Sequence, residues 1–342
     1  AASSTPAAST PAASTPAAST GSDYASLDPV VLRGADSSGV GAAAQQLGEL
    51  VAEKVDAITG GQLTVEYYPN SEMGGDMDIQ QQMLDGTLDY VVLQTAPTVS
   101  FVPAVAVFDL PMVFAQYDGD TIDQVLNGDD SEFLKAIAPK YEEKNMKILG
   151  YLQNATYRLT TSNVKLDTLD AFKGLQIRTM ENQNHMAFWS ALGAAPTPLA
   201  WPEVYISLQN GTIDAQENAA DTCMTSNFQE VQKYLACTNH ILYANQLSMN
   251  KEKYDSLDPA YQAAIVQAVE EAIEEMKPEM KNIDETSKQA LVDGGMTLIE
   301  YDDSFYQEIL ALDTVQALYD KIDADVNGLG TTLQEELAAA QG

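Results

Sequence analysis

The chain contains three arginines, and two of them stand in patterns that suit the binding of an anion. Arg178 lies in the short apolar run Leu175–Thr179, and Arg158 directly precedes a Leu-Thr-Thr-Ser-Asn run. A planar guanidinium binds a carboxylate through two parallel hydrogen bonds, which the point charge of lysine does not reproduce. The two arginines therefore predict a site for a small organic acid. The alternative is a salt bridge on the surface or between domains, because the chain has 50 acidic residues.

The stretch Gly174–Asn218 supplies the elements that would position this site, in the order strand, helix, strand, helix, strand. Pro196 and Pro198 keep Ala195–Ala200 extended, and Pro202 suits the first turn of a helix. Alternating α/β units of this kind place their ligands at the ends of the strands. An arginine, an indole and an amide stand at these ends: Arg178, Trp201 and Asn218.

The same stretch resembles a known family. The sequences IRTMENQ and GAAPTPLAWPEVYISLQNGTIDAQEN, which run from residue 177 to 218, are similar to the substrate-binding proteins of TRAP transporters. One departure is Ala215, where the family usually has glycine. The resemblance implies an α/β, two-lobed, periplasmic-binding-protein-like fold that closes on its ligand by hinge bending. Such a receptor delivers its ligand to TRAP membrane subunits and performs no chemistry.

The resemblance also implies roles for the residues of the second lobe. The carboxylate of the ligand would pair with Arg178, and Arg158 would share its charge. The body of the ligand would lie against Trp201, with a polar group near Asn218. Glu181 could recognise a hydroxyl or an amine, although an acidic residue in that place also suits the start of a helix.

Two loops of the first lobe are expected to face the same cleft. Asp36 follows the first strand, Val30–Arg33, and Gln94 ends the buried strand Leu88–Gln94. Both positions allow a second interpretation, because short polar side chains commonly cap helices and form turns.

The domain boundaries follow from the expected chain crossings near Ala155 and Tyr243. Lobe 1 would hold residues 29–155 and about 244–283, and lobe 2 would hold residues 156–243 and about 284–342. A long acidic helix, Tyr261 to about Gly294, would join the lobes and carry Pro278 in its interior. One helix is predicted over Phe305–Leu318, and the last 20 residues are predicted to be peripheral.

Residues 1–28 are expected to be a disordered tether, because the repeated unit PAAST has too little apolar surface to fold. The tether would hold an extracytoplasmic domain, periplasmic or on the cell surface, at a lipid anchor carried by an upstream cysteine that is not in this chain.

Composition excludes several classes of function. A formal net charge of −33 argues against nucleic acid and anionic membranes as partners. His185 and His240 lack partners at metal-binding spacing and are expected to be packing or surface residues, so neither a metal nor a cofactor is predicted. No catalytic motif is recognisable, and we expect a monomer.

Some alternatives stay open at this stage. A sensory receptor for a signalling partner, or an enzyme that uses the same cleft, would share the fold. The ligand could be a dicarboxylate, a sugar acid, a keto acid, an aromatic acid or a zwitterion. A disulfide between Cys223 and Cys237 is neither required nor excluded.

Overall fold

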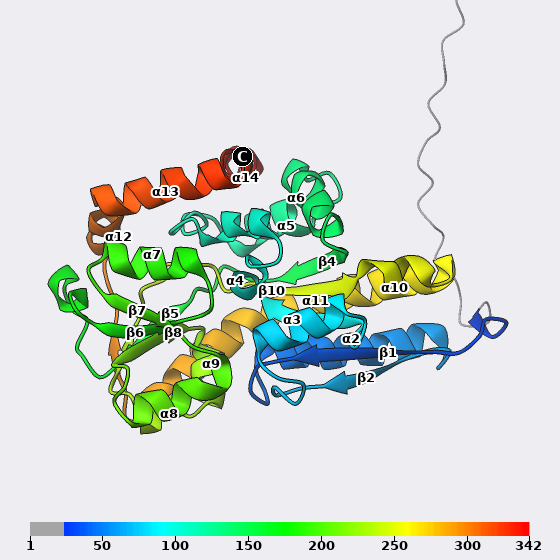
Figure 1. Cartoon of the computed structure of the whole chain (residues 1–342), viewed down its shortest axis with the longest axis horizontal. Helices are drawn as coiled ribbons and strands as arrows, with labels where there is room; N and C mark the ends of the chain where they lie inside the picture. The colour runs from blue at the N-terminus through cyan, green and yellow to red at the C-terminus, as the bar shows by residue number, and fades with distance from the viewer. Residues whose placement is uncertain (1–23, 342) are drawn as a thin grey trace, which may run out of the picture.

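Two separate β-sheets form the framework of the chain (Figure 1). The computed structural model describes residues 24–341. The sheet of lobe 1 contains, in spatial order, β2 (Leu63–Tyr68), β1 (Val30–Asp36), β3 (Tyr90–Gln94), β10 (Asn245–Asn250) and β4 (Met146–Leu152). β1 is parallel to both β2 and β3, whereas β10 is antiparallel to β3 and β4. The four residues from Tyr90 to Leu93 are all buried, as expected for a strand covered on both faces.

The sheet of lobe 2 contains the stretch that resembles the TRAP receptors. Its spatial order is β11 (Thr297–Ile299), β9 (Tyr234–Ala236), β5 (Leu159–Ser162), β8 (Ala215–Asn218), β6 (Gln176–Thr179) and β7 (Ala195–Pro198). β6 is parallel to β7 and β8, so the carboxyl ends of these three strands meet at one edge. The predicted two-lobed α/β fold is thus confirmed.

Helices cover both sheets and connect the strands. Those that follow lobe 1 strands are α2 (Ala43–Thr59), α3 (Asp76–Leu84), α4 (Thr95–Thr98), η1 (Pro103–Asp109), α5 (Gly119–Asn127), α6 (Glu132–Glu142) and α10 (Lys251–Ser256). Those among the lobe 2 strands are η2 (Leu169–Phe172), α7 (Gln183–Ala191), η3 (Trp201–Glu203), α8 (Val204–Gln209), α9 (Ala220–Thr225) and η4 (Phe228–Glu230). None of the helices in residues 24–341 is long and apolar enough to cross a membrane.

The longest helix, α11 (Pro259–Asp293), contacts both lobes. It has 35 residues and, at 1.5 Å per residue, spans about 52 Å. Ile265 and Val269 belong to the core of lobe 1, whereas Leu291 belongs to a core of lobe 2, so Pro278 lies between the two halves. The side-chain amide of Asn154, at the crossing between β4 and β5, donates to the carbonyl of Lys277, 2.8 Å away.

The chain end departs from the prediction. The helix expected over Phe305–Leu318 is wrong, because the chain breaks into α12 (Asp303–Leu310) and α13 (Asp313–Asp325). The last helix, α14 (Leu329–Ala340), packs on α5 and α6 of lobe 1, although residues 284–342 were expected in lobe 2. Leu333 and Leu337 are fully buried there, so the end of the chain is not peripheral.

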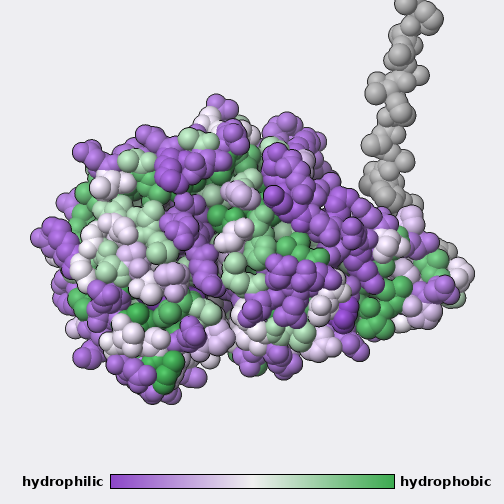
Figure 2. All heavy atoms as spheres, viewed as in Figure 1, coloured by the Kyte–Doolittle hydropathy of each residue, from purple (hydrophilic) through white to green (hydrophobic). Residues whose placement is uncertain are grey.

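Most of the predicted tether lies outside the described residues. Within its described part, Tyr24 is only 1% exposed and its ring stacks on Tyr261, with 5.9 Å between the ring centroids. The chain therefore packs against lobe 1 before residue 28. Hydrophilic side chains cover much of the face shown in Figure 2, in keeping with the high net charge.

Candidate functional site

The two lobes meet around a small polar cavity at the carboxyl ends of their central strands. Its volume is about 20 Å³, which is room for about one water molecule. The lobes are therefore closed on each other in this arrangement. Lobe 1 contributes Ser37, Ser38, Asp76, Gln94 and Asn245 to its lining, and lobe 2 contributes Met180, Trp201, Asn218 and Thr222.

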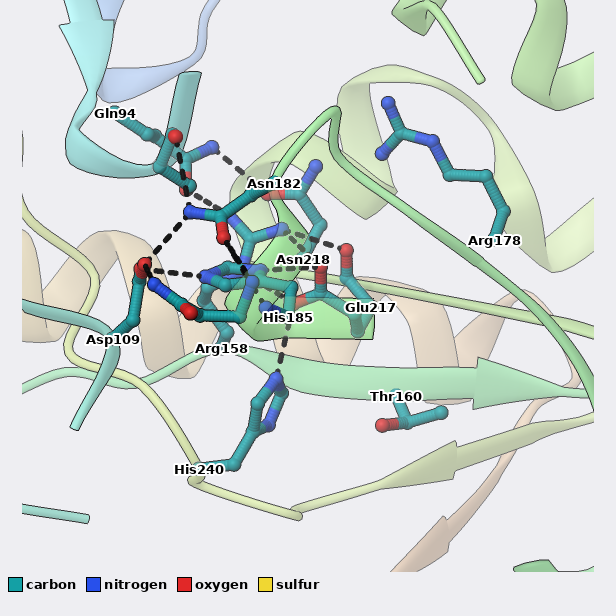
Figure 3. A network of polar contacts seen from close by, with 12 residues as sticks. Gln94, Asp109, Arg158, Thr160, Arg178, Asn182, His185, Glu217, Asn218 and His240 are labelled. Carbon is teal, nitrogen blue, oxygen red and sulfur yellow. Dashed lines mark hydrogen bonds and ion pairs between the residues drawn. The ribbon is translucent and has the colours of Figure 1, made fainter. Parts of the chain in front are cut away.

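Arg178 is a buried cation that retains an unused donor. β6 places it beside the loop that follows β7, and its Nε and Nη2 donate to the carbonyl of Leu199 at 2.9 and 2.6 Å. Its Nη1 is buried and has no hydrogen-bond partner. Figure 3 shows the guanidinium of Arg178 apart from the neighbouring polar network. Burial lowers the pKa of Arg178 to about 10, so the group stays charged at neutral pH.

Trp201 lies directly beside this cation. The Cζ atom of Arg178 is 5.4 Å from the centroid of the Trp201 ring, and that ring also packs against Phe228. η3 holds Trp201 at the cavity wall, because Pro202 favours the first turn of this short helix. The indole therefore forms an aromatic wall next to a charged donor.

Arg158 is engaged within lobe 2, unlike Arg178. Its Nε donates to Oε2 of Glu217 at 2.5 Å, and its Nη2 donates to Oε1 at 2.9 Å. This bidentate pair is almost fully buried, so Glu217 compensates the charge of Arg158. The alternative considered for this arginine was a salt bridge on the surface or between the lobes, whereas the observed pair is buried and lies within lobe 2.

Gln94 bridges the two lobes. Its Oε1 accepts a hydrogen bond from Nη1 of Arg158, and its Nε2 donates to Oδ1 of Asn218 at 2.9 Å. Gln94 comes from β3 of lobe 1. Its partners belong to lobe 2, where Arg158 directly precedes β5 and Asn218 ends β8 (Figure 3). The structure therefore brings together three of the predicted residues through one carboxamide.

Two histidines, predicted to be packing or surface residues, belong to the same buried network. His185 Nε2 lies 3.1 Å from Oδ1 of Asp109, and its Nδ1 lies 3.4 Å from Oε1 of Glu217. His240 Nε2 lies 3.0 Å from Oε2 of Glu217. No spacing rule could reveal this cluster, because the acidic partners of each histidine are at least 23 positions away in the sequence.

The pKa values of the network follow from burial and hydrogen bonding. Burial lowers the pKa of His185, but hydrogen bonds to Asp109 and Glu217 outweigh it and raise the pKa to about 9. Burial lowers the pKa of His240. Burial raises the pKa of Glu217, but Arg158 and both histidines reverse this and hold it well below its usual value.

Four of the predicted site residues are not part of the cavity lining: Asp36, Arg158, Arg178 and Glu181. The carboxylate of Asp36 accepts hydrogen bonds from Ser38, at 2.8 Å from its N–H and 2.6 Å from its hydroxyl, and from Tyr67 at 2.8 Å. Asp36 thus shapes the loop that presents Ser37 and Ser38. Glu181 is exposed at the start of α7.

Asp76 and Asn245 line the cavity, and sequence reasoning missed both. Asp76 is the first residue of α3 and accepts a hydrogen bond from Ser37. Asn245 pairs with Gln94 between β10 and β3, and neither its Oδ1 nor its Nδ2 makes a hydrogen bond of ordinary geometry although it is fully buried. Gly74 and Gly75, which directly precede Asp76, are the sequence signal that could have indicated a loop at this position.

The described part of the chain contains no cluster of three histidine, cysteine or acidic residues that could hold a metal ion. Cys223 and Cys237 are both buried, free thiols, so the possible disulfide is not formed. The site offers hydrogen bonds and charge to a ligand.

Comparisons with known proteins agree with this geometry. The family of bacterial extracellular solute-binding proteins, family 7 (DctP), matches residues 34–325. The 2,3-diketo-L-gulonate-binding periplasmic protein YiaO of Escherichia coli is 31% identical over 252 residues, which cover 74% of this chain and 73% of that protein.

Solved structures give the same result. A TRAP periplasmic solute-binding protein of Chromohalobacter salexigens with bound D-glucuronate is 27% identical, has a TM-score of 0.81, and aligns over 89% of this chain and 99% of its own. A second such protein, of Sulfitobacter with bound β-D-galacturonate, is 26% identical with a TM-score of 0.80 and the same two coverages.

Proposed function

Because the chain belongs to the DctP family of bacterial extracellular solute-binding proteins, we propose that it captures a small organic acid between its lobes and delivers it to TRAP membrane subunits. The unpartnered Nη1 of Arg178 is the observation that carries this proposal. A buried, charged donor without a partner is costly, and a ligand carboxylate would satisfy it. Two similar solved receptors hold D-glucuronate and β-D-galacturonate, which are both carboxylates, and this supports a carboxylate as the recognised group.

The remaining residues of the site would have distinct roles. Arg178 anchors the carboxylate, Trp201 packs on the body of the ligand, and Asn218 offers an amide to it. Arg158 acts mainly through Glu217 and positions Gln94 and the strand ends. Asp36 supports its loop, and Glu181 stays at the rim of the cleft.

Capture requires the lobes to open, because a cavity of about 20 Å³ cannot admit an organic acid. Closure would then be favoured by contacts that the ligand makes to both lobes at once. We place the receptor outside the cytoplasm, where it acts as a monomer with no nucleic-acid partner. It binds and releases its ligand unchanged.

A thermal-shift screen against organic acids, followed by calorimetry, tests the function and the anchor. Arg178→Lys should weaken binding of the acid that the screen identifies by about 3–5 kcal/mol, or about two to four decades in Kd. The reason is that lysine lacks the planar pair of donors with which a guanidinium binds a carboxylate. Arg33→Lys makes the same exchange on the surface of lobe 1 and serves as the control. A loss of less than threefold for Arg178→Lys would contradict the anchor, and the absence of any acid that binds would contradict the receptor function.

A further inference from the structure

The charged groups around the interlobe cavity differ in whether another protein group already pairs with them. Among the described residues at this site, Glu217 compensates Arg158, and Asp109 and Glu217 compensate His185. Arg178, in contrast, keeps one guanidinium nitrogen, Nη1, without a hydrogen-bond partner. One carboxylate can therefore be paired well, and a second would need another cation.

Asp76 makes a second carboxylate still less favourable. It lines the cavity from the N-terminus of α3 in lobe 1, and Ser37 donates a hydrogen bond to it. Burial raises the pKa of Asp76, while the hydrogen bond from Ser37 and the charges of Arg178 and Arg158 oppose the shift. A ligand group that donates a hydrogen bond suits this oxygen pair, whereas a second anion would be repelled.

Asn245 offers an amide that makes no hydrogen bond of ordinary geometry, although the hydroxyl of Tyr243 lies close enough to interact with it. The side chain lies on β10 next to Gln94, is fully buried and lines the cavity. A buried amide whose hydrogen bonds are incomplete costs free energy, and a ligand at the cavity wall would complete them. A hydroxyl group matches an amide best, since it can donate to Oδ1 and accept from Nδ2.

We propose that Asp76 and Asn245 are specificity-determining residues that select an acid with a single carboxylate and a hydroxylated body. The inference rests on the proposed receptor function, in which Arg178 holds the carboxylate. The hydroxyl groups point toward lobe 1, where Asp76 accepts and Asn245 both donates and accepts. These contacts join the anchored ligand to lobe 1 and so couple recognition of the hydroxyl groups to closure.

Calorimetry with matched acids of two lengths tests the selectivity. For each length, one acid is a hydroxylated monocarboxylate, one has the second end oxidised to a carboxylate, and one lacks hydroxyl groups. The probes are D-erythronate, meso-tartrate and butyrate, and D-galactonate, galactarate and hexanoate. We expect the hydroxylated monocarboxylate of at least one length to bind at least tenfold more tightly than its two counterparts.

Two variants test the residues. Asn245→Leu should weaken binding of that acid at least tenfold, while the melting temperature without ligand stays or rises, because a buried amide with incomplete hydrogen bonds is removed. Asp76→Asn should reduce the preference over the dicarboxylate at least tenfold. Asp85→Asn removes one charge at the exposed C-terminal end of the same helix and should change neither preference.

Equal or tighter binding of a dicarboxylate or an unhydroxylated acid would overturn the inference, and so would an Asn245→Leu affinity within threefold of the unaltered protein. Failure of all six acids to bind would also overturn it. The proposed receptor function is decided separately, by the wider acid screen and by Arg178→Lys.

Discussion

His185 and Asp109 join the two lobes through buried side chains: Nε2 of the histidine lies 3.1 Å from Oδ1 of the carboxylate. Asp109 ends η1 in lobe 1, whereas His185 lies in the first turn of α7 in lobe 2. The amides of Asn182 and Asn184 donate to the other oxygen of Asp109, each at 2.9 Å. The start of α7 is thus fastened to lobe 1 by a charged group that can titrate.

The stability of the protein should fall as pH rises from about 6.5 to 9, because the folded pKa of His185 is raised to about 9. The contribution of His185 is fully present below its unfolded pKa of about 6.5 and is lost as pH rises through the folded pKa. The 2.5-unit difference corresponds to about 3 kcal/mol as an upper figure. Urea unfolding at a series of pH values measures it.

The control for this pH dependence is His240→Gln. The pKa of His240 is lowered, so this residue titrates below the window and its replacement should leave the slope unchanged. His185→Gln should flatten the slope, since Asp109 and Glu217 are then left without their titrating partner. A steep slope that persists in His185→Gln would show that another group causes it.

Glu217→Gln should destabilise the fold by about 3–5 kcal/mol, because the substitution leaves the buried guanidinium of Arg158 without its counter-charge. Chemical denaturation measures the change. Glu181→Gln removes the same charge at an exposed position and should stay within about 0.5 kcal/mol. A loss of less than 1 kcal/mol for Glu217→Gln would mean that the network tolerates an uncompensated cation.

Gln94→Ala should open the ligand-free protein, because this side chain bonds to Arg158 and Asn218 across the cleft. We expect a larger radius of gyration by X-ray scattering without ligand, and weaker ligand binding than in the unaltered protein. Gln81→Ala, on the exposed side of α3, is the control. If Gln94→Ala keeps the radius and affinity of the unaltered protein, Gln94 does not hold the lobes together.

Leu337→Ala should cost about 2–5 kcal/mol of stability, because Leu337 is fully buried between α14 and lobe 1. Thermal and chemical unfolding provide the measurement. Glu335→Ala changes an exposed position of the same helix and should have little effect. A small effect of Leu337→Ala would indicate that α14 is loosely attached.

Local sequence signals predicted much of lobe 2. Pro196 and Pro198 forced an extended segment that became β7, and Pro202 marked the start of a helical segment. The long helix was also clear, because its apolar spacing continues past Pro278. These features depend on neighbours in the sequence, which is why a single sequence suffices for them.

The polar network could not be predicted in the same way. Arg158 and Glu217 are 59 positions apart, and Glu217 and His240 are 23 positions apart. Only the pairing of strands and the closure of the lobes bring such groups together. Asn245 likewise looked like an ordinary strand residue, since its significance lies in the hydrogen bonds that its amide lacks.

Pro278 interrupts the hydrogen bonding of α11 at a position between the two lobes. Proline has no amide hydrogen for the carbonyl of Glu274, so one helical hydrogen bond is missing there. Asn154, in the segment between β4 and β5, donates to the carbonyl of the adjacent residue Lys277. Rotation of one lobe relative to the other is therefore expected to bend α11 at Pro278. Because Pro278 is not among the residues that line the cleft, its replacement should change the rate at which the lobes open and leave the contacts that set ligand affinity in place.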